Sequence, residues 1–167
     1  MIILAIDPGT ILSGYGVIRL RGTKYEAIDF GCIRPPRKYK LSDRYLVIFN
    51  SVEELLKKHQ PNCLVVETQY VDKNIQSAIK LGMARGAVVI AAARNNVAVH
   101  EYAPTKAKLA VVGDGRASKK QVQGMVQKIL NLPTPPTPED AADALALAIC
   151  HAQAMHLDTF ATSKVSR

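Results

Sequence analysis

Residues 2–9 have the sequence IILAIDPG, an apolar run that ends in an acid and is followed at once by two turn-forming residues. Such a run predicts a buried strand, so Asp7 lies where that strand stops. Taken alone, Asp7 has an ordinary explanation, because an Asp before Pro-Gly commonly forms an Asx-type turn. Three further acids, at positions 67, 140 and 143, argue for a second role.

The residues after Asp7 predict a sheet of mixed direction. Strand-like runs at 14–20 and 25–33 are separated by short glycine-containing turns, which is typical of an antiparallel meander. Apolar residues at helical spacing predict a helix over 41–59, and a second buried strand follows at 63–67.

A helix over 74–95 and a strand over 97–102 continue this alternation, which implies right-handed crossovers and parallel pairing of the later strands. Two more helices are expected at 118–131 and from 138 to about 155, separated by a proline-rich linker. The expected fold is therefore α/β, with a five-stranded mixed sheet flanked by helices.

The 167 residues suit one domain, expected at 1–156, followed by a flexible tail at 157–167. No apolar run approaches the length that spans a bilayer, and the N-terminus lacks the pattern of a secretory signal, so a cytoplasmic location is expected. The three cysteines and four histidines show no metal-binding spacing, which argues against a disulfide framework or a structural zinc site.

Glu67 ends the predicted strand at 63–67, just as Asp7 ends the first. If these strands are parallel neighbours, their carboxylates lie about 4.8 Å apart at the edge where ligands bind in open α/β sheets. Carboxylates this close repel each other unless a proton or a divalent cation relieves the repulsion. An exposed strand end is the ordinary alternative for Glu67, and this residue alone favours neither explanation.

Asp140 and Asp143 lie near the start of the last predicted helix, in the sequence EDAADA at 139–144. Acids favour the first turn of a helix, here with Thr137 as candidate N-cap, which accounts for Asp140 but not for Asp143. At about 3.6 residues per turn the two acids share a face, and the small alanines allow close approach to the sheet. The four acids are therefore the expected catalytic and metal-binding residues, suited to two Mg²⁺ ions and phosphodiester chemistry.

Lysine and arginine outnumber the acids by 22 to 14, which gives a net charge of +8 and favours polyanionic partners. The segment 106–120 is expected to be a flexible basic loop around its glycines, able to close on phosphates. Tyr70 could stack on an unpaired base or pack its loop onto the sheet, and the residues alone leave both open. The candidate DNA contacts are Tyr70, Lys73, Lys108, Arg116, Lys119 and Lys120.

Several short motifs occur together in the chain: IDPGT at 6–10, GYGVI at 14–18, ARG at 84–86, VVG at 111–113 and DAADALA at 140–146. In this combination the chain resembles the RuvC family of bacterial crossover junction endodeoxyribonucleases, the Holliday junction resolvases, over nearly its whole length. Thr68, Gln69 and Asp72 depart from the commoner family pattern, which leaves the cleavage-sequence preference open.

The resemblance implies a ribonuclease H-like fold and a homodimer that resolves four-way DNA junctions by paired symmetric nicks during recombination and repair. It implies Mg²⁺ at the four acids, with Mn²⁺ as a substitute, and the branch-migration proteins RuvA and RuvB as partners. It assigns Tyr70 to the junction centre, Lys108 and Lys119 to DNA contacts, and the helix with Gly82 and Gly86 to the dimer interface.

Two other functional classes compete with this interpretation. The DPGT sequence at 7–10 also resembles the first phosphate-binding turn of the actin, Hsp70 and sugar kinase ATPases, but those proteins need two such domains around the nucleotide. A junction- or RNA-binding protein without catalytic activity would explain the basic charge, yet binding alone gives no reason for Asp143.

Overall fold

The computed structural model describes residues 1–68 and 74–165, with side chains as far as His156. A central five-stranded sheet has the order β3-β2-β1-β4-β5. β1 pairs antiparallel with β2 and parallel with β4, so the predicted mixed sheet is confirmed. The strands are β1 (Ile2–Asp7), β2 (Ser13–Arg21), β3 (Lys24–Ile33), β4 (Cys63–Glu67) and β5 (Ala98–Tyr102).

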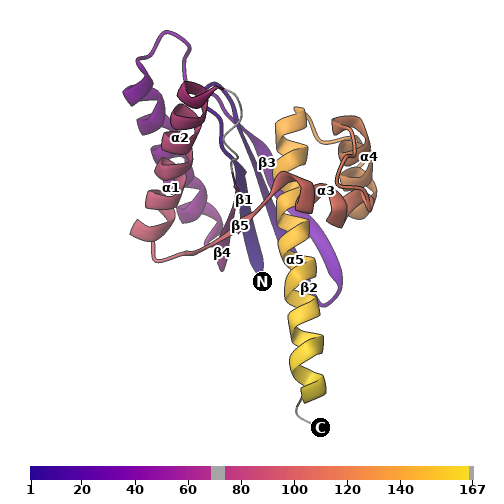
Figure 1. The fold of residues 1–167 in the computed structure, drawn as a ribbon. Helices are drawn as coiled ribbons and strands as arrows, with labels where there is room; N and C mark the ends of the chain where they lie inside the picture. The colour runs from indigo at the N-terminus through magenta and orange to yellow at the C-terminus, as the bar shows by residue number, and fades with distance from the viewer. Residues whose placement is uncertain (69–73, 166–167) are drawn as a thin grey trace.

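Helices cover both faces of this sheet, with α1 and α2 on one side and α3, α4 and α5 on the other (Figure 1). Side chains alternate between the faces along each strand. Leu4 and Ile6 therefore pack in the core beneath α1 and α2, whereas Ile3 and Ala5 pack beneath α5. The helices are α1 (Leu41–His59), α2 (Ile75–Arg94), α3 (Pro104–Val112), α4 (Lys119–Ile129) and α5 (Glu139–Val165).

The start of α5 lies unusually close to β2. A Cβ atom added at Gly14 would meet the carbonyl oxygen of Asp140 at 1.9 Å, and one added at Gly16 would meet Leu145 Cδ2 at 2.8 Å. The predicted alanine face of the helix is confirmed, because Ala141 and its neighbouring alanines on α5 are buried. Two glycines on the strand and small residues on the helix together bring the α5 acids toward the sheet.

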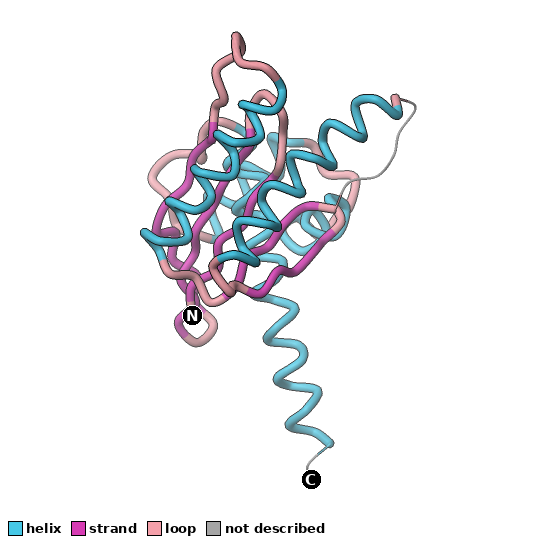
Figure 2. Tube along the Cα trace, turned by 90° about the vertical axis from the view of Figure 1, so that its left-hand side faces the viewer, coloured by secondary structure: helices cyan, strands magenta, loops and turns pink. Residues whose placement is uncertain are grey.

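Two expectations from the sequence are wrong. The segment 106–120 is not a continuous flexible loop, because α3 extends to Val112 and α4 begins at Lys119. Pro104 at the first turn and Gly113, with φ +82 at the C-cap, delimit α3. The last helix does not end near Met155 but continues to Val165 through a segment without Gly or Pro (Figure 2). The expected flexibility of 157–167 stays a prediction.

Helix α2 carries several exposed apolar side chains, among them Ile75, Ile79 and Ile90. Within the described ranges it is the one helix that is long and apolar enough, by length and composition, to cross a membrane. Its Arg85 pairs with Glu101 of β5, and the Lys80 carbonyl accepts a hydrogen bond from Tyr45 of α1. Charges near the middle of the helix are costly in a bilayer, so these contacts favour packing against protein.

Candidate metal centre

The two strand-end acids lie side by side and face α5. Ile6 of β1 is in parallel register with Val66 of β4, so the next residues, Asp7 and Glu67, end adjacent strands. Both acids continue the strand faces that pack beneath α5. Neighbouring strands lie about 4.8 Å apart, so the prediction that these strands are parallel neighbours is confirmed.

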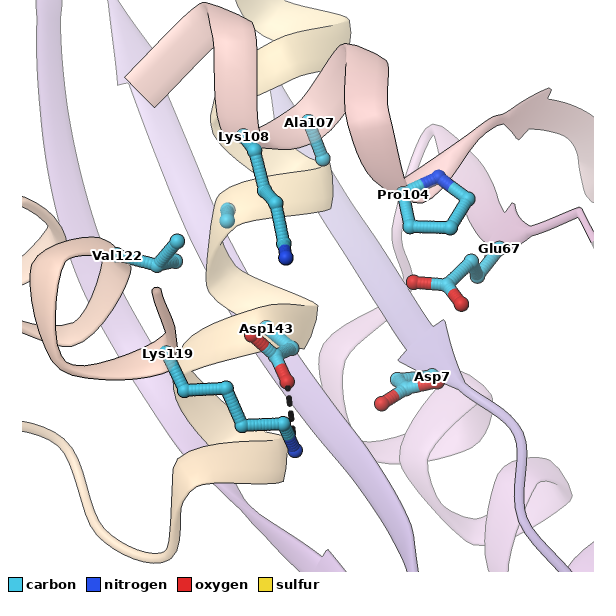
Figure 3. A pocket seen from close by; sticks show the side chains of 9 residues that line it. Asp7, Glu67, Pro104, Ala107, Lys108, Lys119, Val122 and Asp143 are labelled. Carbon is cyan, nitrogen blue, oxygen red and sulfur yellow. Dashed lines mark ion pairs between the residues drawn. The ribbon is translucent and has the colours of Figure 1, made fainter. Parts of the chain in front are cut away.

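Asp143 joins these two acids from α5 and completes a shared cleft of about 220 Å³ (Figure 3). Each helix contributes residues spaced three or four apart, as one helical face requires. The lining comprises Asp7, Glu67, Pro104, Ala107, Lys108, Lys119, Val122, Asp143 and Ala146.

Asp140 lies at the edge of this arrangement, one turn before Asp143 and close to the backbone of Gly14. It is half-buried and does not line the cleft. Its negative charge nevertheless contributes to the raised pKa values of Asp7 and Asp143. The structure thus brings three of the four predicted acids directly together and places the fourth within electrostatic reach.

The environment of the cleft opposes ionisation of its acids. Burial, and next the charge of Glu67, raises the pKa of Asp7 from 3.8 to about 8. Burial, and next the charge of Asp143, raises the pKa of Glu67 from 4.5 to about 7. Burial also raises the pKa of Asp143, although Lys119 opposes that shift. A positive charge among these acids would oppose these upward shifts, because it favours the ionised forms.

Lys119 supplies one such charge. Its Nζ lies 3.4 Å from Asp143 Oδ2. The position of Lys119 follows from the start of α4, where Ser118 and Gln121 form a reciprocal capping box. Although burial alone would lower it, the charges of Asp143 and Asp140 raise the pKa of Lys119. Lys108 of α3 also lines the cleft, and its charge lowers the pKa of Glu67 against burial.

The donor set suits a hard divalent cation. Asp7, Glu67 and Asp143 converge with carboxylate oxygens, and the described residues that line the cleft include no cysteine or histidine. Magnesium and manganese prefer oxygen ligands, and a cation would offset the burial and the repulsion that raise the pKa values of these acids. The cluster therefore fits the metal expected from the sequence.

The other predicted site residues are distributed unevenly. Tyr70 and Lys73 lie outside the described residues. Arg116 and Lys120 are exposed and do not line the cleft, in contrast to Lys108 and Lys119. The contribution of Gly14 and Gly16 to the position of α5 was missed, although their alternation along a predicted strand was a signal for close approach of another element.

Known proteins are similar to this chain in sequence and in fold. The family model for crossover junction endodeoxyribonuclease RuvC matches residues 3–151. The protein of that name from Protochlamydia amoebophila (strain UWE25) is 68% identical over 153 residues, covering 92% of this chain and 91% of its own. The structure of Thermus thermophilus RuvC in complex with Holliday junction substrate has a TM-score of 0.89 at 34% identity, covering 95% of this chain and 97% of that one.

A more distant match supports the fold alone. The yeast mitochondrial Holliday junction resolvase has a TM-score of 0.65 at 16% identity, covering 96% of this chain and 83% of that one. The ribonuclease H-like resolvase fold that the sequence resemblance implied is therefore confirmed.

Proposed function

The chain belongs to the RuvC family of crossover junction endodeoxyribonucleases, and we propose that it resolves Holliday junctions by Mg²⁺-dependent paired nicking during recombination and repair. The observation that carries the proposal is the convergence of Asp7, Glu67 and Asp143 in one cleft of a basic protein. A protein that only bound DNA would have no use for three half-buried acids whose pKa values are raised first by burial and also by neighbouring negative charges.

We assign the metal ligands to Asp7, Glu67 and Asp143, with Asp140 completing the set from the preceding turn of α5. Two Mg²⁺ ions, which Mn²⁺ can replace, would supply an activated water and stabilise the leaving oxygen of the phosphodiester. The rigid strand ends and α5 fix the ligand positions. This arrangement is supported by the all-carboxylate donor set and by the proximity of the three elements that carry it.

Lys108 and Lys119 approach the same cleft from α3 and α4, and we propose that they hold the DNA phosphate against the acids. Ammonium groups beside a reacting phosphate stabilise the charge that develops there. Arg116 and Lys120 are exposed nearby along the chain, and they are proposed to contact the junction arms instead. Tyr70 and Lys73 remain candidates for contacts near the crossover point, as the family resemblance implies.

Two symmetric nicks require two such sites, and we propose that a homodimer formed through α2 provides them. The proposal is supported by a continuous apolar stripe on that helix. Gly82 and Gly86 face open space rather than another part of the described chain, so a second subunit can approach closely. The exposed apolar residues of the stripe are Ile75, Ile79, Met83 and Ile90.

We extend the proposal to three further expectations that rest on family membership. Residues 1–156 would act as a single nuclease domain. The branch-migration proteins RuvA and RuvB would deliver or position the junction. A DNA junction as the substrate also favours the cytoplasmic location expected from the sequence, because bacterial chromosomal DNA lies in that compartment.

A direct assay distinguishes a junction-cleaving nuclease from a protein that only binds the junction. Purified protein is incubated with a synthetic four-way junction, with and without Mg²⁺, while binding and strand cleavage are followed in parallel. The proposal expects binding in both conditions and paired nicks only with Mg²⁺. Binding without nicks in any divalent cation would favour the non-catalytic alternative.

A further inference from the structure

A second set of metal-binding side chains lies on the same face of the sheet, away from the acids. Cys63 begins β4, His100 lies in the middle of β5, and His151 lies on α5. One ligand atom from each residue can be chosen so that all three lie within 4.8 Å of one another. Cys63 is four residues from Glu67 along the strand, a distance of about 13 Å at 3.3 Å per residue.

The strand register explains why these residues meet. Val65 of β4 pairs with His100 of β5, so His100 lies on the same face as Cys63, two residues earlier along β4. That face packs beneath α5, which presents His151 from above. The sheet and helix therefore bring together three residues that are 37 and 51 positions apart in the sequence.

Among the described residues, the buried imidazole of His151 has a hydrogen-bond partner for one ring nitrogen and none for the other. Its Nδ1 lies 2.9 Å from the Tyr102 hydroxyl, whereas its Nε2 is buried with no hydrogen-bond partner among the described residues. Leaving a buried polar atom unpaired costs about 1 to 3 kcal/mol. Histidines that ligate metals usually have their other ring nitrogen fixed by such a hydrogen bond.

We propose that Cys63 Sγ, His151 Nε2 and a ring nitrogen of His100 form a site for a borderline-soft divalent transition metal, with Zn²⁺ as the best fit. Thiolate and imidazole are the ligands that Zn²⁺ prefers, and a tetrahedral site requires donors roughly 3.3 to 3.8 Å apart. The side chain of His100 is exposed and can rotate to close the remaining gap. The fourth ligand would then be water on that exposed side.

Packing of two tilted imidazoles without a metal is the simpler alternative, since the His100 and His151 ring centroids lie 4.3 Å apart. Ring packing alone does not explain why His151 Nε2 lacks a hydrogen-bond partner among the described residues, or why the Cys63 thiol lies beside it. Burial, and next the charge of His100, lowers the pKa of His151 to about 4, so its imidazole is neutral and able to ligate at neutral pH. A bound metal would connect β4, β5 and α5, which also carry Glu67, Tyr102 and Asp143.

Cobalt(II) is a suitable spectroscopic probe of this site in the full-length protein. Excess Mg²⁺ is included so that the carboxylate cleft is occupied by a hard cation. We expect one equivalent of Co²⁺ to give a thiolate-to-cobalt charge-transfer band and tetrahedral visible bands. Oxygen ligands from the acids would give neither. A correctly folded protein that binds Co²⁺ without the charge-transfer band would overturn the proposal.

Matched variants assign the band to the three residues. Cys63→Ser should abolish it, and His100→Gln should weaken Co²⁺ binding about tenfold or more. Because His100 is exposed, that variant should remain folded. Cys150→Ser and His156→Gln remove a thiol and an imidazole of α5 outside the cluster and should leave the band unchanged. A band that survives Cys63→Ser, or one that disappears in Cys150→Ser alone, would contradict the assignment.

Thermal stability gives an independent readout. Zn²⁺ should raise the Tm of the parent protein in the presence of Mg²⁺, because it binds only the folded state. The same Zn²⁺ should leave the Tm of His100→Gln nearly unchanged. An equal Tm increase in both proteins would place the binding elsewhere and refute the site.

Discussion

The Lys119 ammonium lies 3.4 Å from the Asp143 carboxylate, which connects the first residue of α4 to α5 inside the acidic cleft. This pair places a cation among the half-buried acids of the cleft. It also lowers the pKa of Asp143 against the effect of burial. Lys119 therefore favours the ionised form of Asp143 against burial, and it is positioned to meet a DNA phosphate at the cleft.

Lys119→Met is expected to reduce the nicking rate by roughly 100-fold or more, because it removes a positive charge beside the reacting phosphate. The loss of Lys119 should also raise the pKa of Asp143. Since Asp143 must ionise to bind the cation, the acidic limb of the pH–rate profile should move to higher pH. Single-turnover cleavage measured across pH checks both effects.

Lys128→Met, on the same helix but away from the cleft, serves as the control and should nick at close to the parent rate. If Lys119→Met leaves the nicking rate and the pH–rate profile unchanged, Lys119 does not contribute to catalysis.

Stability without divalent cations should depend on pH through the raised pKa values of Asp7 and Glu67. The unfolded chain releases these protons near their ordinary values of 3.8 and 4.5, whereas the folded protein retains them to about 8 and about 7. The folded state then binds more protons, so its free energy of unfolding should fall between about pH 4 and pH 8, on the order of a few kcal/mol.

Urea unfolding in EDTA at several pH values measures this loss. Mg²⁺ should restore stability most strongly at the alkaline end, where the acids ionise and repel one another. Asp7→Asn removes one of the raised groups and should flatten the dependence. If the free energy of unfolding of the variant falls with pH as steeply as that of the parent, the cleft acids do not cause the pH dependence.

Gly14→Ala is expected to destabilise the fold by about 3 kcal/mol or more and to impair cleavage, because the new methyl group would overlap the Asp140 carbonyl. Displacement of α5 would also move Asp143 away from the strand ends. Gly124→Ala on α4 is the matched control, since its Cβ would enter open space. That change should be neutral or stabilising by up to about 1 kcal/mol. Equal stability of both variants in chemical denaturation would argue against close packing of α5 on β2.

The exposed apolar stripe on α2 predicts that a charge introduced there weakens the dimer. Met83 is 54% exposed in the single chain, so Met83→Glu should preserve the fold while opposing association of two apolar surfaces. Sedimentation should report a monomer, and junction cleavage should lose its pairing of the two nicks. Leu109→Glu places the same charge on an exposed residue of α3 and should leave the dimer intact. A Met83→Glu protein that remains dimeric would move the interface away from this stripe.

Much of the fold was predictable because local patterns agree with the final packing. The helix at 41–59 and the strand at 63–67 have the predicted bounds, since each has a clear apolar period and a clear stop. Asp7 and Glu67 were placed correctly by a general rule, that parallel strands end at a common edge. Helix α3 was missed because its glycine-containing end resembles a loop, whereas its apolar residues pack only in the tertiary structure.

Side-chain positions were harder to anticipate than strand ends. No spacing in the sequence separates Lys108 and Lys119, which line the cleft, from Arg116 and Lys120, which do not. For Lys119 and Lys120 that distinction depends on the rotation of α4 about its axis, whereas Arg116 lies in the connection between α3 and α4. The Cys63, His100 and His151 cluster escaped detection for a similar reason, because metal-binding spacing is recognised within short segments and these residues come from three separate elements.

Asp7→Asn tests most directly whether Asp7 and its neighbouring acids perform junction cleavage. Asparagine resembles the protonated carboxyl group that the buried site favours without metal, so the variant should fold and bind the junction within a few-fold of the parent. Nick mapping on a synthetic four-way junction with Mg²⁺ should show paired symmetric cuts by the parent and a rate at least roughly 1000-fold lower for the variant. If Asp7→Asn makes the same paired cuts at the parent rate, the cleft is not the catalytic centre.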